Sequence, residues 1–378
     1  MKYKLKDIFD LQMGKTPARN NRNYWNTKEN KWISIADLSK TGKYISTTKE
    51  YLSDAAVEES GIKVIPANTV VMSFKLSIGK TAITTEEMYS NEAIMAFHDR
   101  RVVDILPEYV FYMFKYRNWE EGSNKAVMGK TLNKATLSDV EIEICPIEKQ
   151  REIVAVLDKL MAVLEHREDE LQLLDKLIKA RFVEMFGDPR SNPFSFDEWM
   201  LKDTCKVITG NTPSRAVSEY YGNYVEWIKT DNIVSGLLNP TKATECLSEK
   251  GMEAGRIVER DSILMACIAG SIASIGRVCV TDRTVAFNQQ INAVVPEKYN
   301  VLFLYVLLQI SKDYLVEDVN MALKGILSKS KLEEKKFIVP PIELQNQFAD
   351  FVNQVNKSKV AVLKNYSQGG VLSYDNQF

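Results

Sequence analysis

The sequence has few cysteines and few histidines. Its five cysteines are widely spaced and form no CxxC pair: Cys145, Cys205, Cys246, Cys267 and Cys279. The two histidines, His98 and His166, stand apart from all of them. Because a zinc site needs clustered thiolate and imidazole ligands, we expect no metal site. We expect reduced, structural cysteines and a cytoplasmic protein.

Membrane and export signals are missing too. No apolar run approaches the roughly 18 residues that a membrane span needs. Residues 1–10 (MKYKLKDIFD) carry charge throughout and have no apolar centre. We therefore expect neither a signal peptide nor a membrane among the partners.

Most enzyme signatures are absent as well. The sequence has no GxxxxGK[ST] loop for nucleotide phosphates and no GxGxxG. An adenine methyltransferase would hold its flipped base with an Asn-Pro-Pro-aromatic turn, whereas Asn192-Pro193-Phe194 lacks the second proline. Nuclease-like ExK tripeptides, such as those at 29–31 and 333–335, are expected by chance in a chain with 26% charged residues. We predict no catalytic residue and no cofactor bound by this chain.

The net charge of −1 argues against a simple nucleic-acid binder, but the charge is unevenly distributed. Residues 1–49 hold eleven basic against four acidic residues. Residues 148–188 hold seven basic against ten acidic residues. The pattern suggests different partners for different segments, with chance fluctuation along the chain as the alternative.

The sequence does contain an internal repeat, with an offset of about 196 residues. The loop Gly14–Arg19 (GKTPAR) returns as Gly210–Arg215 (GNTPSR). Later landmarks recur in the same order: Trp32-Ile33 as Trp227-Ile228, Ser77-Ile78-Gly79-Lys80 as Ser274-Ile275-Gly276-Arg277, Asn91 as Asn288, Gly129 as Gly325, and Pro146–Gln150 as Pro341–Gln345. Two similar units in one chain suit a ligand that has two halves, such as DNA with two half-sites.

Each repeat begins with a stretch that predicts a mixed α/β or α+β domain, over residues 1–146 and 188–341. Short runs rich in β-branched residues predict strands at Val70–Phe74, Ile142–Ile144, Ser262–Met265 and Val278–Val280. Apolar residues dominate 107–117 and 300–311, which predicts helices there. Each stretch is long enough to bury its own core.

A long helix is predicted after each globular stretch. Between Gln150 and Phe186 there is neither glycine nor proline, and Gly187-Asp188-Pro189 ends the run. Apolar residues alternate at spacings of four and three, the heptad pattern of a coiled-coil seam, and the second copy keeps the register. The predicted seam residues are Ile153, Leu157, Leu160, Leu164, Leu171, Phe348, Val352, Val355, Val362 and Tyr366. Each seam contains one cation, Arg167 in the first helix and Lys359 in the second.

We predict that the two helices pack on each other. A pseudo-two-fold relation between the repeats would make them antiparallel; the alternative is that each helix packs only on its own domain. The predicted organisation is two globular domains (1–146 and 188–341), a central helix (147–187), a distal helix (342–366) and a C-terminal tail (367–378).

Polar residues near the repeated landmarks are the candidates for DNA contact. Small residues permit close backbone approach, arginine suits phosphate or guanine, amides suit adenine, and lysines suit phosphates. The first repeat supplies Gly14, Lys15, Thr16, Arg19, Lys75, Ser77, Lys80, Asn91, Lys130 and Lys134. The second supplies Asn211, Thr212, Ser214, Arg215, Lys229, Ser274, Arg277, Asn288, Gln289, Gln290, Lys324, Lys329 and Lys331. The alternative for each is ordinary loop polarity, and we interpret Trp25, Trp32, Tyr221 and Trp227 as packing residues.

This order of motifs, present twice, resembles the specificity (S) subunit of type I restriction–modification enzymes. The resemblance covers about residues 1–366. It implies an α+β architecture with two mixed α/β target recognition domains in a tandem pseudo-two-fold repeat, joined by a pair of long antiparallel coiled-coil helices. Each domain would read one half of a bipartite site in double-stranded DNA.

The resemblance also implies partners. The helices would set the half-site spacing and dock two modification (methyltransferase) subunits, which bind S-adenosylmethionine and methylate adenine N6. Restriction (motor-nuclease) subunits would join them, so ATP and Mg are expected on partner subunits. The chain departs from the family pattern at Lys149 and Leu344, where a glutamate is frequent, and its second helix ends before any match to 174–187.

Two other functions remain open from the residues alone. The near-zero net charge and the acidic central helix favour a coiled-coil assembly scaffold that binds no DNA. An enzyme, either a nuclease or a methyltransferase, with an active site that the motifs do not reveal is the other. Salt dependence separates the first from a DNA-binding subunit, because phosphate contacts release counterions.

Overall fold

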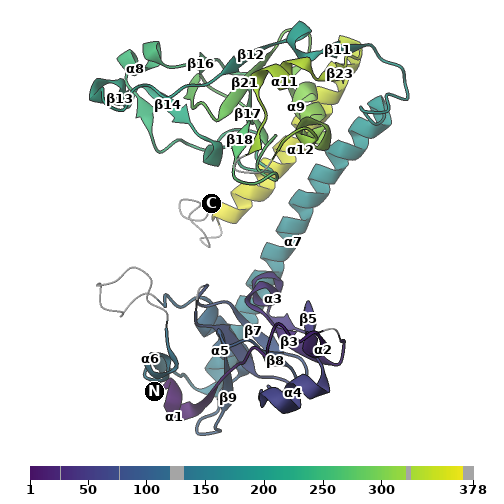
Figure 1. The fold of residues 1–378 in the computed structure, drawn as a ribbon. Coiled ribbons are helices and arrows are strands. Elements are labelled where there is room, and N and C mark those ends of the chain that lie inside the picture. Colours follow the sequence, from purple (N-terminus) through teal and green to yellow (C-terminus); the bar gives the residue numbers. More distant parts are fainter. Residues whose placement is uncertain (26, 76, 120–131, 321–324, 369–378) are drawn as a thin grey trace. The chain divides into compact units, whose positions relative to one another are not determined.

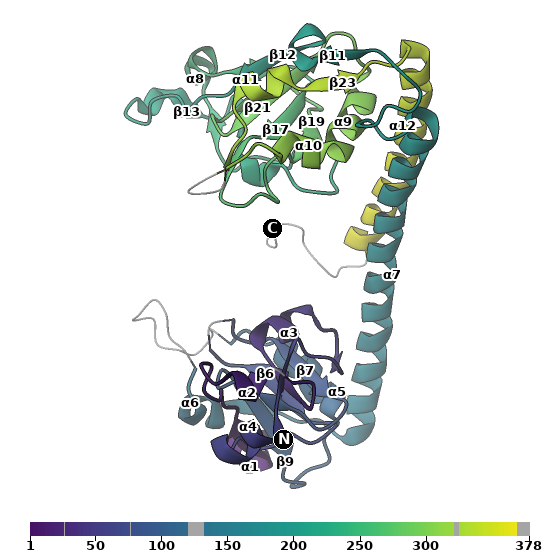
Figure 2. The same ribbon diagram turned by 45° about the vertical axis from the view of Figure 1, so that its right-hand side comes forward.

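The chain divides into two compact units, Met1–Leu164 and Glu165–Phe378. The computed structural model describes residues 1–368 except 26, 76, 120–131 and 321–324, with side chains described as far as Leu363. Figures 1 and 2 show sheets and short helices in each unit. One long helix, α7 (Ile147–Phe186), belongs to the first unit at its start and to the second at its end.

The N-terminal unit is built on a five-stranded sheet of order β2-β9-β6-β7-β4, in which β4 and β7 are parallel and the other pairs antiparallel. These strands are β2 (Phe9–Met13), β4 (Tyr44–Ile45), β6 (Val70–Ser73), β7 (Thr81–Thr84) and β9 (Ile94–Asp99). A second sheet of order β5-β3-β8 joins β3 (Asn30–Ile33), β5 (Glu50–Leu52) and β8 (Tyr89–Ser90). Strand β1 (Lys2–Lys4) pairs with β10 (Glu141–Glu143), so the first and last strands of the domain are neighbours.

The C-terminal unit contains a related pair of sheets. One has the order β12-β21-β17-β19: β12 (Cys205–Thr209), β17 (Ile263–Ala266), β19 (Val278–Val280) and β21 (Ile291–Pro296). The other has the order β13-β15-β14-β20-β16: β13 (Tyr221–Gly222), β14 (Val225–Ile228), β15 (Cys246–Leu247), β16 (Ile257–Val258) and β20 (Val285–Phe287). Two short pairs complete it: β11 (Glu198–Met200) with β23 (Lys336–Ile338), and β18 (Ile268–Ala269) with β22 (Gly325–Ile326).

Short helices connect the strands of both units. In the N-terminal unit they are α1 (Leu5–Ile8), α2 (Arg22–Trp25), α3 (Ile35–Lys40), α4 (Asp54–Ser60), α5 (Pro107–Lys115) and α6 (Lys134–Ser138). In the C-terminal unit they are η1 (Leu201–Asp203), η2 (Ser218–Tyr220), η3 (Thr230–Asn232), α8 (Glu249–Ala254), α9 (Val301–Ile310), α10 (Lys312–Val316) and α11 (Lys329–Glu334), and the long helix α12 (Ile342–Gln368) follows the last strand. The order of elements therefore repeats, and the sequence motifs stand on equivalent elements of the two units.

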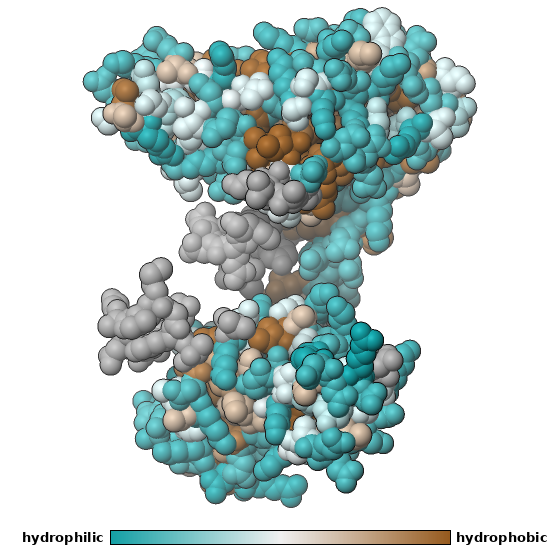
Figure 3. Space-filling view, viewed as in Figure 1, coloured by the Kyte–Doolittle hydropathy of each residue, from teal (hydrophilic) through white to brown (hydrophobic). Residues whose placement is uncertain are grey.

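The core of each unit lies between one sheet and one apolar helix: the five-stranded sheet and α5 in the N-terminal unit, and the four-stranded sheet and α9 in the C-terminal unit. In the N-terminal unit α5 buries Phe111 and Phe114, and Phe114 packs edge-on against Phe97 of β9 with ring centroids 4.8 Å apart. In the C-terminal unit α9 buries every residue from Leu302 to Leu308. Burying such apolar surface is the main stabilising contribution to each domain. In contrast to these cores, the surface that Figure 3 shows is largely hydrophilic, with small hydrophobic patches.

The glutamine of each Pro-Ile-Glu-x-Gln motif connects the start of a long helix to its domain by hydrogen bonds. Gln150 is fully buried; its Oε1 accepts from Leu106 N (2.9 Å) and its Nε2 donates to Asp104 O (2.9 Å). Gln345 is also buried; its Oε1 accepts from Asn300 N (2.9 Å) and its Nε2 donates to the Pro340 carbonyl (2.8 Å). Buried amides need such partners, so the shared glutamine is explained by the fold.

Within the C-terminal unit, α12 packs antiparallel on the end of α7. Phe348, near the start of α12, contacts Phe182 and Phe186, near the end of α7, with ring centroids 5.5 and 5.6 Å away. Further along α12, Lys359 forms an ion pair with Asp175, which lies earlier in α7. The Lys359 side chain is 11% exposed, so the seam cation is neutralised by an acid on the facing helix.

The predicted seam is divided between two cores. Phe348, Val352 and Val355 are buried in the core of the C-terminal unit, and Val362 is buried as well. Leu157 instead packs against the core of the N-terminal unit, beside Val154 and Met161, as in the alternative that a helix packs on its own domain. The remaining predicted positions of α7 are half-buried: Ile153, Leu160, Leu164 and Leu171. The Tyr366 side chain lies outside the described residues.

The predicted seam did not include two buried phenylalanines at the end of α7. Phe182 and Phe186 are fully buried, although the predicted seam ended before them. Their signal was present, because Phe182 continues the spacing of four from Ile178.

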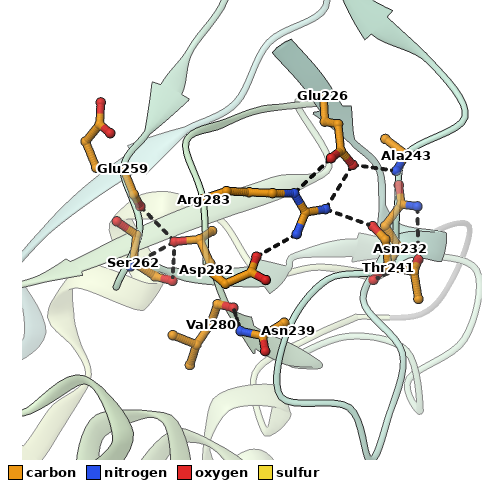
Figure 4. A network of polar contacts seen from close by, with 11 residues as sticks. Glu226, Asn232, Asn239, Thr241, Ala243, Glu259, Ser262, Val280, Asp282 and Arg283 are labelled. Atoms are coloured by element: carbon orange, nitrogen blue, oxygen red, sulfur yellow. Dashed lines mark hydrogen bonds and ion pairs between the residues drawn. The ribbon is translucent and has the colours of Figure 1, made fainter. Parts of the chain in front are cut away.

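One ion pair occurs in both units with its charges exchanged. In the N-terminal unit Lys31 binds Glu86, with 2.5 Å between Nζ and Oε1. At the equivalent positions of the C-terminal unit, Glu226 accepts two hydrogen bonds from Arg283, Nε to Oε1 at 2.8 Å and Nη2 to Oε2 at 2.9 Å. Figure 4 shows the Arg283 guanidinium between Glu226, Asp282 and the backbone of Thr241. Burial alone would raise the pKa of Glu226, but the hydrogen bonds from Arg283 hold it below its usual value.

Candidate nucleic-acid interface

The Gly-x-Thr-Pro loops follow β2 and β12, and their glycines serve the fold. Gly14 N donates to Ile94 O (3.1 Å), and Gly210 N donates to Ile291 O (3.0 Å). A Cβ on Gly14 would lie 2.2 Å from Asn91 O, and a Cβ on Gly210 would lie 2.2 Å from Asn288 O. The predicted close backbone approach therefore occurs within each domain, between this loop and the loop that carries the repeated asparagine, Asn91 or Asn288.

The threonine of each loop forms a hydrogen bond with an exposed polar side chain of the asparagine loop. The hydroxyl of Thr16 donates to Glu92, and that of Thr212 donates to Gln289 at the equivalent place. The hydrogen bond from Thr16, together with the positive charges of Lys75 and Arg19, holds the pKa of Glu92 below its usual value. The two units thus present different chemistry on the same support: a carboxylate accepts hydrogen bonds, whereas an amide both donates and accepts. Glu92 was not among the predicted residues.

The arginine that ends each loop is engaged inside its own domain. Arg19 forms a bidentate pair with Glu50 and lies over the rings of Trp25 and Trp32. Arg215 pairs with Glu245 and lies over two aromatic rings in the same way. Trp32 and Trp227 are buried, as the packing interpretation of these aromatics expected.

The Ser-Ile-Gly-Lys/Arg segments form equivalent turns whose glycines have positive φ, 87° at Gly79 and 76° at Gly276. Lys80 is exposed, and its ammonium group has no hydrogen-bond acceptor among the described residues. Arg277 is half-buried and donates to Thr230 O (3.1 Å) and Ser274 O (3.4 Å). Of the two, Lys80 is the one without a partner among the described residues, so it is the stronger candidate for a phosphate contact. The serines of these segments make hydrogen bonds within the turns: Ser77 O accepts from the Ser73 hydroxyl, and Ser274 Oγ accepts from Ser271 Oγ (3.0 Å).

The repeated asparagine shapes a turn. Asn91 Oδ1 accepts from Ala93 N (3.0 Å), and Asn288 Oδ1 accepts from Gln290 N (3.1 Å). Asn288 is buried and its Nδ2 also donates to Gln290 Oε1, so its amide is engaged within its own domain, and its contact with adenine stays a prediction. Gln289, the exposed amide next to it, remains the candidate.

The other predicted cations differ in how far they are already neutralised. Lys134 and Lys329 begin the equivalent helices α6 and α11 and are exposed, and Lys329 lies 3.5 Å from Glu333. The side chains of three more are engaged: Lys15 with Ser60 O, Lys229 with Glu245, and Lys331 with Asp318 O. The remaining polar candidates, Lys75, Asn211 and Ser214, are half-buried or exposed. Lys130 and Lys324 lie outside the described residues.

The cysteines are all free thiols. Burial raises the pKa of Cys205, Cys267 and Cys279 to about 12, which keeps them protonated and unreactive near neutral pH. Among the described residues, no group of three or more His, Cys, Asp or Glu side chains could hold a metal ion. In that same part of the chain, no helix is both long and apolar enough to cross a membrane.

Comparison with known proteins agrees with this doubled architecture. The family described as the type I restriction modification DNA specificity domain matches the chain twice, over residues 1–174 and 195–368. The MjaIX specificity subunit of Methanocaldococcus jannaschii is 24% identical, over 96% of this chain and 89% of its own. The HindI specificity subunit of Haemophilus influenzae is 29% identical over 41% of this chain and 37% of its own.

Solved structures show the same fold. The type I S subunit of M. genitalium superposes with a TM-score of 0.55 at 14% identity, covering 97% of this chain and 92% of that one. A chain solved in a study of complex assembly in a type I system also gives 0.55, at 17% identity and 98% and 93% coverage.

Two tandem domains of one family over nearly the whole chain define the class of protein. The chain belongs to the type I restriction–modification DNA specificity family, and it is a specificity subunit, whose function is to recognise DNA sequence. Specificity subunits are non-catalytic parts of type I restriction–modification complexes. The comparisons give no support to a scaffold that binds no DNA.

Proposed function

We propose that each unit of this chain reads one half of a bipartite site in double-stranded DNA. The observation that carries the proposal is the repeated support at the interface. In both units the loop glycine docks on the asparagine loop, and the loop threonine holds an exposed polar side chain, Glu92 in one and Gln289 in the other. Because the support is shared and the presented group differs, the two units are suited to different base sequences.

We further propose that α7 and α12 hold the spacing of the half-sites and dock two modification subunits. At about 1.5 Å per residue, the 27 residues of α12 extend roughly 40 Å, comparable to one turn of B-DNA. The modification subunits would bind S-adenosylmethionine and methylate adenine N6, and restriction subunits would bring ATP and Mg. This chain would bind none of these cofactors itself, and the assembly would act on DNA in the cytoplasm.

The test is a genome-wide map of N6-methyladenine in cells with and without the gene for this chain. We expect one split motif, two short specified halves around a fixed spacer, to lose methylation when the gene is deleted and to regain it on complementation. Loss of a continuous motif, or an unchanged map in cells that express the chain, would contradict the proposal.

A further inference from the structure

Arg19 of the N-terminal unit is held from three sides by its own domain. Its two Nη atoms lie 2.5 and 3.2 Å from the carboxylate oxygens of Glu50. Its guanidinium carbon lies 3.8 Å from the ring centroid of Trp25 and 4.7 Å from that of Trp32. The two indoles meet edge-on at 84°. Each indole N–H also donates to a carbonyl of the Gly-x-Thr-Pro loop, that of Ala18 (3.1 Å) and that of residue 15 (3.1 Å).

The C-terminal unit repeats this arrangement with different residues. Arg215 Nη2 lies 2.7 Å from Glu245 Oε2, and the guanidinium carbon lies 4.7 Å from the ring of Tyr221 and 5.3 Å from that of Trp227. Tyr221 donates through its hydroxyl to Pro213 O (2.7 Å), and Trp227 donates through its indole to the carbonyl of residue 211 (3.3 Å). An arginine, a carboxylate and two aromatic rings therefore fix the same loop twice.

We infer that Arg19 and Arg215 are positioning residues that clamp the Gly-x-Thr-Pro loops and do not bind DNA phosphate. Glu50 accepts one hydrogen bond from each terminal nitrogen of Arg19 and neutralises its charge, and Trp25 lies against one face of the guanidinium, although 48% of the side chain is exposed. The aromatic rings hold the loop backbone and the arginine at once, which keeps Thr16 and the group that it supports in place. Arginine suits this role because its planar fork pairs bidentately and stacks on rings, which lysine does not reproduce.

This inference rests on the proposed DNA recognition. An alternative role for Glu50 predicts the opposite change in DNA affinity when its charge is removed. If Glu50 merely neutralised Arg19 until DNA arrived, the carboxylate would compete with phosphate for the guanidinium. Removing the carboxylate charge would then strengthen DNA binding. In a clamp the same change loosens the loop and weakens binding.

The experiment measures binding of the full chain, assembled with its modification subunits, to a DNA duplex that carries the methylated motif. We expect Glu50→Gln and Arg19→Lys each to weaken binding by about tenfold, as for loss of a charge-assisted bidentate contact. The double variant should be no weaker than either single one, because both changes break one unit. Glu245→Gln and Arg215→Lys should reproduce the pattern for the other half-site.

Salt dependence supplies the second readout and the control. Each phosphate contact contributes about 0.9 to the slope of log affinity against log salt. Arg19→Met should leave this slope unchanged, whereas Lys80→Ala should reduce it by about one contact. Tighter binding by Glu50→Gln, full binding by Arg19→Lys, or a reduced slope for Arg19→Met would overturn the clamp. A wild-type complex without sequence-specific binding would instead refute the proposed function.

Discussion

Replacing Gly210 by alanine is expected to destabilise the C-terminal unit by about 3 kcal/mol, at the upper end of overpacking costs. The added Cβ would lie 2.2 Å from Asn288 O and 2.6 Å from Phe287 O. Both atoms are backbone, so no side-chain rotation relieves the contact. The loop or the asparagine turn must move, and the hydrogen bond between Gly210 N and Ile291 O would be lost.

Urea unfolding of the full chain, with hydrogen exchange at β12 and β21 to localise the change, measures this effect. Gly270→Ala is the matched control in the same unit, because nothing lies within 4 Å of its added Cβ. We expect it to be neutral or to stabilise by up to about 1 kcal/mol. In the N-terminal unit, Gly14→Ala should be severe and Gly42→Ala harmless for the same reasons. Equal stability of Gly210→Ala and Gly270→Ala would contradict the proposed close approach.

Replacing Phe348 by alanine is expected to cost about 3–5 kcal/mol of unfolding free energy, the usual range for a buried phenylalanine. Phe348 is fully buried and contacts the rings of Phe182, Phe186 and Phe303, so its removal leaves a cavity where α12 meets α7 and α9. The loss should appear as faster hydrogen exchange in the second half of α7 and in α12.

Val360→Ala is the control for Phe348→Ala, since Val360 lies on the same helix but is 47% exposed. We expect it to change the unfolding free energy by less than about 0.5 kcal/mol. If Phe348→Ala were as mild as Val360→Ala, the antiparallel packing of α12 on the end of α7 would be wrong.

The repeat in the sequence predicted two similar domains, each followed by a long helix. Its landmarks recur because each one makes a contact that the fold needs twice: the loop glycine, the buried glutamine at the helix start, and the tryptophan that binds a loop carbonyl. Such contacts are visible in the sequence because equivalent positions of the two units require the same residue type. The strand and helix predictions held for the same reason: Val70–Phe74 became β6, and 300–311 became α9.

The functional assignment of individual residues could not be predicted as well. A repeated polar residue suggested a ligand, yet Arg19, Asn288 and Arg277 are engaged by their own domain. Sequence spacing does not reveal such partners, because Glu50 lies 31 residues from Arg19 and stands on β5, opposite the Trp32 of β3 whose ring Arg19 covers. Glu92 was missed because it differs between the repeats. The residues that the repeats share maintain the fold, so base-reading residues are to be sought among those that differ.

The central claim is that the two units read separate halves of one site, and exchanging one of them tests it most directly. Residues 1–146 would be replaced by the corresponding domain of another specificity subunit, and the N6-methyladenine motif of the host genome would be mapped again. The account predicts that one half of the motif changes while the other half is retained. Change in both halves, or an unaltered motif from an assembled and active complex, would contradict it.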